Sequence, residues 1–359
     1  MEGWLNRGQR GGFTRISFEW FCTLCSILIL SSCNGCSLQW AEQDDAETFT
    51  FLSYNVHNLF DDRDDGGEYP EYSVAEGRWN RTQYLKKLEN LARVVRESSP
   101  GGADFLGLYE IENQRVLKDL IDLYLPRMGY REYTAVGTDK SGIRIGFITR
   151  LPVSSCTVHQ PLSMGFPQRP VLELVVDCGG NPLWVFLCHF KSKREGAEAT
   201  ERNRVAAAEV VRKRVQCILE EDGSREILIL GDLNENIDEY ERVGGRYPTA
   251  LVPMEEFASE MEGLVISRDP KASGNDDGSF VFYSPWFDET TGTGSYWYQG
   301  NWETIDHVLI SPNLLRAPDL VYSRFQVVTL PYLLKDSGQP DSAYSDHLPL
   351  WVEFVRHGE

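Results

Sequence analysis

Short apolar runs, most of them followed by polar residues, recur along most of the chain. Their residues are apolar throughout or alternate with polar ones, and Val, Ile, Leu and Phe predominate, as is typical of β-strands. Nine such runs predict strands at residues 48–56, 104–109, 143–149, 171–177, 183–189, 226–231, 280–283, 305–310 and 348–355.

Three further segments have apolar residues at helical spacing. Residues 82–97 and 116–128 each carry an apolar stripe, and Gly129 follows the second as a predicted C-cap. Residues 197–221 carry a longer stripe of Val, Ala and Ile. Many strands with a few helices laid over them predict a layered α/β sandwich. No repeat or internal linker divides the chain beyond residue 48, so we expect one large domain.

The first residues predict a leader rather than part of the fold. Arginines precede the apolar residues 20–30, a run too short to span a bilayer comfortably. It closes on Leu-Ser-Ser-Cys, which resembles the lipobox of bacterial lipoproteins, whose cysteine is lipidated after cleavage. We therefore expect a signal peptide at 1–32, lipidation at Cys33, a polar linker at 33–47 and a folded domain at 48–356.

An uncleaved anchor helix or an ordinary signal peptide is the alternative to the lipobox. Each version predicts export. The lipobox further predicts a bacterial lipoprotein anchored to a membrane and facing the periplasm or the cell surface.

Acidic residues outnumber basic ones. The formal net charge is −19, and removal of residues 1–32, with three Arg and two Glu, would leave −20. This balance argues against tight non-specific binding to nucleic acid, which depends on neutralising phosphates with Lys and Arg. It does not exclude a nuclease, because a local basic groove and a bound divalent metal can offset a negative body.

Cysteine spacing does not predict a zinc site, because the chain past Cys33 has no CxxC pair. Cys156 and Cys178 flank a predicted hairpin, and a disulfide between them is one alternative for an exported protein. Buried free thiols are the simpler expectation.

Carboxylates and an amide follow two of the apolar runs. Glu110 emerges from strand 104–109 and is a hard oxygen ligand suited to Mg²⁺ or Mn²⁺. Glu112 is a neighbouring candidate, and we expect one of the two to point elsewhere because alternate strand residues face opposite sides. Asp232 and Asn234 follow a buried run and can face one side, offering an anionic acceptor and a neutral amide to a phosphoryl group. A solvated glutamate and a turn-stabilising Asx motif are the structural alternatives.

Asp306 and His347 open the last two predicted strands. A carboxylate hydrogen-bonded to a histidine fixes the tautomer of the ring and raises its basicity. The pair would therefore make a general base.

His189 closes another apolar run. It has a structural alternative as a buried histidine of the core. Lys191 and Lys193 lie directly after it and favour contact with a substrate phosphate over that alternative.

Taken in this order, the motifs resemble those of the endonuclease/exonuclease/phosphatase superfamily. The strongest pieces are GDLN at 231–234, SDHLPL at 345–350 and WETIDHVLIS at 302–311. The segment YNVHNLFDD at 54–62 is most similar to a secreted bacterial branch. The resemblance runs from about Thr48 to Val355.

The resemblance implies a fold and a cofactor. The fold is a four-layered α/β sandwich of two packed mixed or antiparallel β-sheets flanked by helices. The cofactor is one or two divalent ions, Mg²⁺ or Mn²⁺, with Ca²⁺ as a further candidate. Asn55 and Glu110 match metal-binding positions, and Asp346 matches a further ligand.

The resemblance also implies catalytic roles. His347, oriented by Asp306, is expected to take part in activating water. Asp232 and Asn234 match the pair that positions the nucleophile and stabilises the transition state, and His189 matches a histidine that contacts the phosphate. At Arg144 the chain departs from the family pattern, so the role of that residue is open.

Two regions bear on the substrate. Residues 61–79 are acidic and could hold Ca²⁺, but they lack EF-hand spacing, so a solvated loop is the better expectation. Residues 280–302 are rich in aromatic side chains, which can stack bases, insert among lipids or simply pack a long hairpin. Packing is the simplest of the three.

We expect a divalent-metal-dependent phosphoesterase, and specifically an exported nuclease that hydrolyses phosphodiester bonds by in-line attack of water. The alternative is an enzyme that acts on phospholipids such as sphingomyelin or on inositol phosphates. A remote alternative is a non-catalytic lipoprotein that binds surface partners. The expected partners are nucleic acid and, through the lipid anchor, a membrane; nothing indicates an obligate protein partner.

Overall fold

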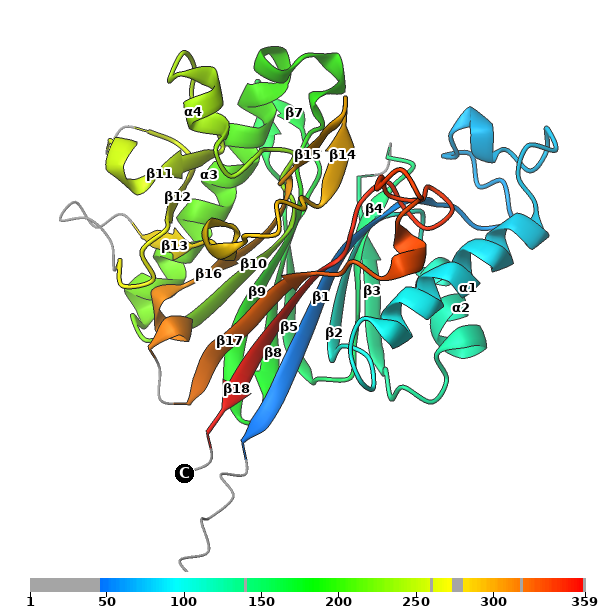
Figure 1. Ribbon diagram of the computed structural model, residues 1–359, viewed down its shortest axis with the longest axis horizontal. Helices are drawn as coiled ribbons and strands as arrows, with labels where there is room; N and C mark the ends of the chain where they lie inside the picture. Colours follow the sequence, from blue (N-terminus) through cyan, green and yellow to red (C-terminus); the bar gives the residue numbers. More distant parts are fainter. Residues whose placement is uncertain (1–45, 139–140, 259–260, 273–279, 317–318, 358–359) are drawn as a thin grey trace, which may run out of the picture. The chain divides into compact units, whose positions relative to one another are not determined.

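Two β-sheets pack face to face, and helices cover their outer faces (Figure 1). The computed structural model describes residues 46–357 except 139–140, 259–260, 273–279 and 317–318. The predicted signal peptide, Cys33 and all but the last two residues of the predicted linker lie outside the described residues.

The first sheet is mixed. β1 pairs with β2 in parallel and with β18 in antiparallel orientation. Its spatial order is β17 (Leu320–Val327), β18 (Leu350–Arg356), β1 (Glu47–Leu59), β2 (Phe105–Ile111), β4 (Arg144–Thr149) and β3 (Glu132–Val136).

The second sheet is mixed as well. β10 lies between β9, which is parallel to it, and β16, which is antiparallel. Its spatial order is β11 (Leu251–Pro253), β12 (Leu264–Ser267), β13 (Val281–Tyr283), β16 (Asp306–Ile310), β10 (Glu226–Asp232), β9 (Asn181–His189), β8 (Val171–Cys178) and β5 (Val153–His159).

Helices and two short hairpins complete the described fold. The hairpins are β6 (Leu162–Ser163) with β7 (Phe166–Pro167), and β14 (Tyr296–Tyr298) with β15 (Asn301–Glu303). The α-helices are α1 (Arg81–Glu97), α2 (Gln114–Tyr124), α3 (Ala197–Glu221) and α4 (Glu239–Val243).

Three apolar cores separate the layers. Phe51 and Leu230 belong to the core between the two sheets. Leu88 of α1 and Leu117 of α2 pack on the outer face of the first sheet, and Val211 of α3 packs on the outer face of the second. The order is helix, sheet, sheet, helix, so the predicted four-layered α/β sandwich is confirmed.

The helix predictions differ in accuracy. α1 and α3 match their predicted spans to within one residue. α2 begins earlier than predicted, where the Asn113 side chain accepts a hydrogen bond from the Val116 N–H at 3.2 Å and caps the helix. It also ends before residue 128, because Pro126 disfavours a helical conformation at Leu125. The prediction of Gly129 as its C-cap is therefore wrong.

Every predicted strand is present, but polar edge strands escape the hydrophobic pattern. β5 has five consecutive exposed residues and lies at the edge of its sheet. Cys156 on β5 pairs in register with Leu174, not with Cys178, and both cysteines are free. Cys178 is buried as expected, whereas Cys156 is exposed. None of the described helices is both long and apolar enough to cross a membrane.

One half-buried ion pair joins β8 of the second sheet to the covering helix α3. Arg214 of α3 donates two hydrogen bonds to the Glu173 carboxylate on β8, from Nε at 2.9 Å and from Nη2 at 3.0 Å. His159 on β5 lies 2.6 Å from the same carboxylate. Burial alone would raise the pKa of Glu173, but these hydrogen bonds outweigh burial and lower it to about 2.

This pair predicts a pH dependence of stability. Because the pKa of Glu173 is lower in the folded than in the unfolded chain, its contribution is present above about pH 4.5 and is lost toward pH 2. We expect Glu173→Gln to lower the free energy of unfolding at pH 7 by about 2 kcal/mol and to flatten the pH dependence in that window. Urea unfolding at several pH values measures both. The exposed Glu89→Gln is the control, and equal curves for the two variants would contradict the assignment.

Candidate active site

The candidate residues converge on one edge of the two sheets. Asp232, the last residue of β10, is in register with His189 at the end of β9 and with Asp306 at the start of β16. Asn55 and Glu110 come from β1 and β2 of the facing sheet. Parallel strands end at the same edge, and antiparallel neighbours begin there, which explains why distant sequence motifs meet.

Gly231 lets β10 approach β9 closely just before Asp232. A Cβ at this position would lie 2.1 Å from the Cys188 carbonyl oxygen. Only glycine fits that space, so the glycine of the GDLN motif sets the position of the carboxylate that follows it.

Asp232 is buried and held by two amides. The Asn55 side-chain NH₂ donates to Asp232 Oδ2 at 3.0 Å, and the Asn234 N–H donates to Oδ1 at 2.9 Å. Burial raises the pKa of Asp232 to about 7, and the neighbouring Asp306 adds to the effect. The carboxylate therefore combines fixed geometry with an unusual affinity for a proton or a cation.

His189 lies between two of the carboxylates. Its Nε2 is 3.6 Å from Asp232 Oδ2 and 3.8 Å from Glu110 Oε1. Burial lowers the pKa of His189 well below its ordinary value, helped by the positive charge of Arg169. The ring is neutral near pH 7 and can donate a hydrogen bond to a phosphoryl oxygen.

Backbone bulges aim the metal-binding candidates at this edge. Glu110 has φ 66° at a register shift in β2, and its Oε2 accepts a hydrogen bond from the Asn58 N–H at 3.0 Å. His57 and Asn58 also have positive φ, at a shift in β1. Lys87 Nζ donates to the His57 carbonyl at 3.1 Å and holds this segment from α1. Strained bulges of this kind recur beside active sites, where they re-aim side chains.

Glu112, the neighbouring candidate, points elsewhere as expected of one of the pair. It is buried, and its carboxylate accepts a hydrogen bond from the Asp61 N–H at 2.7 Å. Its carbonyl accepts from Arg144 Nε at 2.8 Å. Arg144, whose role was open, therefore supports the backbone after β2.

His347 and Asp306 form the predicted pair. His347 Nδ1 lies 2.7 Å from Asp306 Oδ2, and the Tyr296 ring packs on the imidazole with its centroid 4.7 Å away. Burial by itself would lower the pKa of His347, but Asp306 outweighs burial and raises it to about 10. Asp306 thus favours the protonated imidazole and fixes the orientation of the ring. In the protonated form the ring can donate a hydrogen bond to a phosphoryl oxygen, and in the neutral form it can act as the general base expected from the sequence.

A cavity of about 830 Å³ opens over these residues. Its lining includes most of the predicted site: Glu110, His189, Lys193, Asp232, Asn234, Asp346 and His347. Asn55 and Asp306 lie behind this surface, each bound to a lining residue. Lys191 is not part of the lining, and its ammonium pairs with Glu195 at 2.8 Å. Its geometry therefore gives no support to the predicted contact with substrate.

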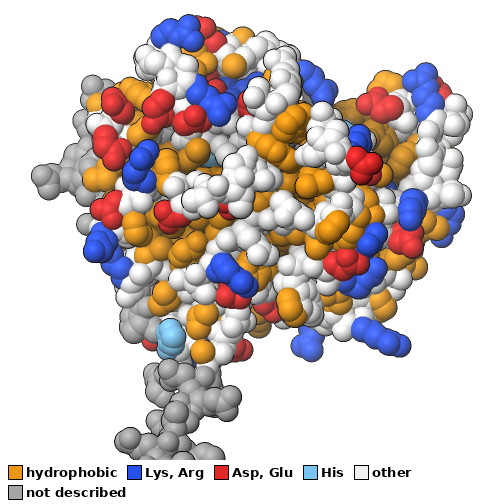
Figure 2. Space-filling view, viewed as in Figure 1, with side chains coloured by type: hydrophobic (Ala, Val, Ile, Leu, Met, Phe, Trp, Pro, Cys, Tyr) orange, Lys and Arg blue, Asp and Glu red, His pale blue; other side chains and the backbone are white. Residues whose placement is uncertain are grey.

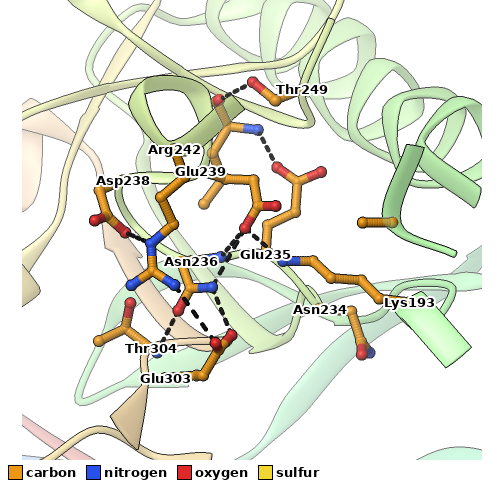
Figure 3. Close-up of polar contacts among 12 residues, drawn as sticks. Lys193, Asn234, Glu235, Asn236, Asp238, Glu239, Arg242, Thr249, Glu303 and Thr304 are labelled. Atoms are coloured by element: carbon orange, nitrogen blue, oxygen red, sulfur yellow. Dashed lines mark hydrogen bonds and ion pairs between the residues drawn. The ribbon is translucent and has the colours of Figure 1, made fainter. Parts of the chain in front are cut away.

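The loop after β10 builds one wall of the cavity (Figure 3). Asn236 donates to Glu303 Oε2 of β15 at 2.6 Å and accepts from the Thr304 N–H at 2.9 Å. Glu239 pairs with Lys193, and Arg242 reaches Glu303 at 3.5 Å. The wall is a network of matched charges, so Lys193 is partly neutralised before any ligand binds.

A buried arginine of α3 holds the same loop in place. Arg204 of α3 is fully buried, and its Nε lies 3.2 Å from Glu235 Oε1. The Glu235 carboxylate also accepts hydrogen bonds from the Ala250 and Leu251 N–H groups, both at 3.0 Å. This network anchors the residue directly after Asn234, whose φ of 54° is otherwise unfavourable.

Several lining residues have no clear signal in the sequence. Asn236 lies two residues after Asn234 in the same loop, so the spacing that singles out Asn234 also points to Asn236. Arg169 and Tyr69 come from loops, and Arg194 from a short 3-10 helix, whose positions depend on the tertiary fold. No local periodicity reveals them.

The acidic segment 61–79 does not gather its carboxylates on a common point. Asp61 is buried against Arg115 at 2.9 Å. Asp64 accepts from the Val74 N–H at 2.7 Å and also from the next amide. These carboxylates organise a loop whose Tyr72 lines the cavity. That arrangement offers no support for a Ca²⁺ site, and most residues of the segment are exposed, as expected of a solvated loop.

The aromatic segment 280–302 divides into two parts. Trp286 is buried, and its Nε1 donates to the Asp306 carbonyl at 2.8 Å. Trp297 packs edge-on against Trp302 at 5.2 Å. Packing therefore accounts for much of the segment, whereas Tyr296 and Tyr298 line the cavity.

The donor set fits a divalent metal. Asp306 lies 2.7 Å and Asp346 3.9 Å from the His347 ring nitrogens. Glu110 and Asp232 lie beside His189 in the same cavity. Burial and the negative charge of Asp306 both raise the pKa of Asp232. Asp232, Asp306 and His347 have ligand atoms within 4.8 Å of one another. Since Asp306 already binds the His347 ring, Glu110 and Asp346 remain the better ligands, with Asp232 beside them. Hard oxygen ligands of this kind suit Mg²⁺ or Mn²⁺.

Buried carboxylates, amides and two histidines at the edge of two packed sheets define a site for hydrolysis of an anionic ester. The sequence matches the model of the Endonuclease/Exonuclease/phosphatase family over residues 50–243, more than half of the chain. The chain belongs to this family, whose enzymes hydrolyse phosphoester bonds and generally depend on a divalent metal. The match ends before Asp306 and His347, which the structure brings to the same site.

Solved structures with this fold are similar over most of the chain. An endonuclease/exonuclease/phosphatase family protein from Bacteroides thetaiotaomicron is 17% identical, with 88% of this chain and 100% of that one covered and a TM-score of 0.54. Mannosyl-6-phosphatase from the same organism is 17% identical, with coverages of 86% and 99% and a TM-score of 0.52. Truncated TDP2 from Caenorhabditis elegans is 15% identical, with coverages of 86% and 97% and a TM-score of 0.51. These identities show the fold alone, and no curated protein matches the sequence.

The donor set predicts metal binding that can be measured without turnover. We expect Mn²⁺ to raise the melting temperature, EDTA to reverse the rise, and Glu110→Gln to weaken Mn²⁺ binding by about tenfold or more. Calorimetric titration with Mn²⁺ gives the affinity. Glu89→Gln, on the exposed face of α1, should bind as the wild type does. Unchanged Mn²⁺ affinity in Glu110→Gln would remove Glu110 from the ligand set.

Proposed function

We propose that this phosphoesterase is an exported, metal-dependent nuclease that hydrolyses phosphodiester bonds by in-line attack of water. The observation that carries the proposal is the placement of Asp232, clamped by Asn55 and Asn234, beside the His347–Asp306 pair in one cavity. That arrangement provides an acceptor for the water proton and donors for the phosphoryl oxygens within one site.

Each residue has a task that follows from its contacts. Asp232 orients the attacking water and accepts its proton. Asn234 uses one side-chain hydrogen on the Phe190 carbonyl at 3.2 Å and keeps the other for a phosphoryl oxygen. His189 and His347 donate to the remaining oxygens, and Asp306 keeps the His347 ring in the orientation that presents Nε2.

A divalent ion held by Glu110 and Asp346 would supply Lewis-acid stabilisation of the phosphoryl charge. The strained backbone at Glu110 keeps this carboxylate aimed at the cavity without rearrangement. Pre-set ligands of this kind reduce the reorganisation needed during the reaction.

The charge of the cavity limits how much nucleic acid it can contact. Six carboxylates and four cations line it, and two of those cations, Lys193 and Arg242, are paired with carboxylates. On the face shown in Figure 2, Lys and Arg side chains alternate with Asp and Glu and do not gather into one basic surface. We therefore expect contact with a short single-stranded stretch or a strand end, not with a long duplex.

The same charge balance favours a second candidate. A compact phosphoester, such as a phosphorylated polyol or a lipid head group, needs no extended basic track. The mannosyl-6-phosphatase from Bacteroides thetaiotaomicron has the same fold, and its name describes action on a phosphorylated sugar. This candidate differs from the first in the ester that would be hydrolysed, not in the catalytic residues.

Activity and its residue dependence test the proposal. The purified protein is incubated with single-stranded DNA, RNA, sphingomyelin and inositol phosphates, with Mg²⁺ or Mn²⁺ and with EDTA. We expect metal-dependent loss of nucleic acid, reduced by at least about a thousandfold in Asp232→Ala, with a stability change of about 1 kcal/mol or less. Asp122→Ala on α2 should be fully active. Cleavage of the lipid or polyol substrates alone would move the assignment to the second candidate, and activity in EDTA would overturn the metal-dependent mechanism.

Export and anchoring are part of the proposal and have their own test. The lipobox-like segment ending at Cys33 supports lipidation. We expect Cys33→Ser to move the protein from the membrane fraction to the soluble fraction of a bacterial host without changing its specific activity. Persistent membrane fractionation of the variant would point to an uncleaved anchor.

A further inference from the structure

The β14–β15 hairpin carries two tyrosines into the cavity. Tyr296 and Tyr298 are alternate residues of β14, so their side chains leave the strand on the same side. Their ring centroids are 6.3 Å apart, and the ring planes differ by 17°. The two rings are therefore nearly parallel, and we call this pair of rings the tyrosine ledge.

The inner end of the ledge touches the catalytic histidine. Tyr296 forms an antiparallel bridge to His347 and packs on its ring. Ser295, one residue earlier, accepts a hydrogen bond from the Leu348 N–H at 2.6 Å, and its hydroxyl accepts from the Asp306 N–H at 3.1 Å. The ledge is therefore fixed directly beside His347.

The outer end of the ledge is open. Tyr298 is 51% exposed, although it lines the cavity. Tyr72, on the loop wall of the same cavity, already stacks on Phe60 at 4.6 Å, so one face of that ring is occupied. Of these two lining tyrosines, Tyr298 is the one with a large unburied surface beside the site.

The polar side chains next to the ledge are already paired with one another, and Figure 3 shows these contacts. Glu303, at the end of the hairpin, binds Asn236 and Arg242, and Glu239 binds Lys193. A ligand rich in hydroxyls would have to compete with these pairs for hydrogen bonds. A planar ring would not, because it binds through its face.

We propose that Tyr296 and Tyr298 form a stacking site for the base of the nucleoside next to the scissile phosphate. Aromatic side chains hold bases through their π-faces with little sequence preference, and this tolerance suits a site with few free cations. The inference rests on the proposed function and adds to it the part of the substrate that is recognised. A single base lies on the ledge, since two rings offer only a short surface.

Two phosphodiesters with the same leaving group test the ledge. The p-nitrophenyl ester of thymidine 5′-monophosphate carries a base, and methyl p-nitrophenyl phosphate carries none. Tyr298→Ala should raise KM for the thymidine ester by about tenfold with kcat nearly unchanged. It should leave kcat/KM for the methyl ester as in the wild type, and Tyr298→Phe should keep both activities. Phe166→Ala, at an exposed aromatic outside the cavity lining, is the matched control.

Each other outcome has a defined meaning. An unchanged KM for the thymidine ester in Tyr298→Ala, or an equal loss on both esters, would overturn the ledge while leaving the phosphodiesterase proposal in place. Ribose 5-phosphate and thymidine 5′-monophosphate are also compared as inhibitors of the wild type and of Tyr298→Ala. If the substitution weakens inhibition by both compounds equally, the ledge holds a sugar and the base assignment is overturned. Hydrolysis of neither ester by the wild-type protein with Mg²⁺ or Mn²⁺ would overturn the proposed function itself, and the stacking role with it.

Discussion

The burial of several carboxylates at one edge of two packed sheets is the constraint on which the site depends. Carboxylates taken out of water repel one another and favour protonation, and the raised pKa of Asp232 records this cost. The fold offsets it with neutral amides from Asn55 and Asn234 and with the imidazole of His347 beside Asp306. The remaining negative charge suits a divalent cation.

Rigid support from the surrounding fold keeps this arrangement in place. Glu110 and Asn234 both have left-handed backbones, which cost energy in residues with side chains. Arg204 is buried between Glu201 and Glu235 under the loop of Asn234, and removing the arginine would leave two buried carboxylates without this counter-charge. The surrounding contacts thus hold Glu110 and Asn234 in backbone conformations that these residues would not adopt by themselves.

The sequence predicts most of the fold and much of the site, for identifiable reasons. Buried strands such as β10 carry long apolar runs, and register then brings Asp232 to His189 and Asp306. The sequence does not predict that Lys191 lies outside the cavity, because the residue follows the end of β9, where strand alternation no longer fixes the direction of a side chain. It also does not predict how strongly Asp306 raises the pKa of His347, since that depends on the distance between the two side chains in the folded chain.

Other parts of the site depend on contacts that no local pattern contains. The bulges at Asn58 and Glu110 arise from pairing between strands about 50 residues apart in the chain. The cavity walls come from the loop around Tyr72, from Arg169 and from the β14–β15 hairpin, whose positions follow from tertiary packing. Aromatic richness in the hairpin segment is visible in the sequence, but which rings face the cavity is not.

The direction of β1 has a consequence for any attachment to this domain. β1 starts at Glu47 beside the end of β18 at Arg356, and it runs to the catalytic edge over 13 residues, about 40 Å. Both terminal strands therefore leave the sheet at the edge remote from the cavity (Figure 1). A support, a fluorescent protein or a second enzyme joined at either of these strand ends would leave the mouth of the cavity open, so the domain is suited to immobilisation with its catalytic edge facing the solution.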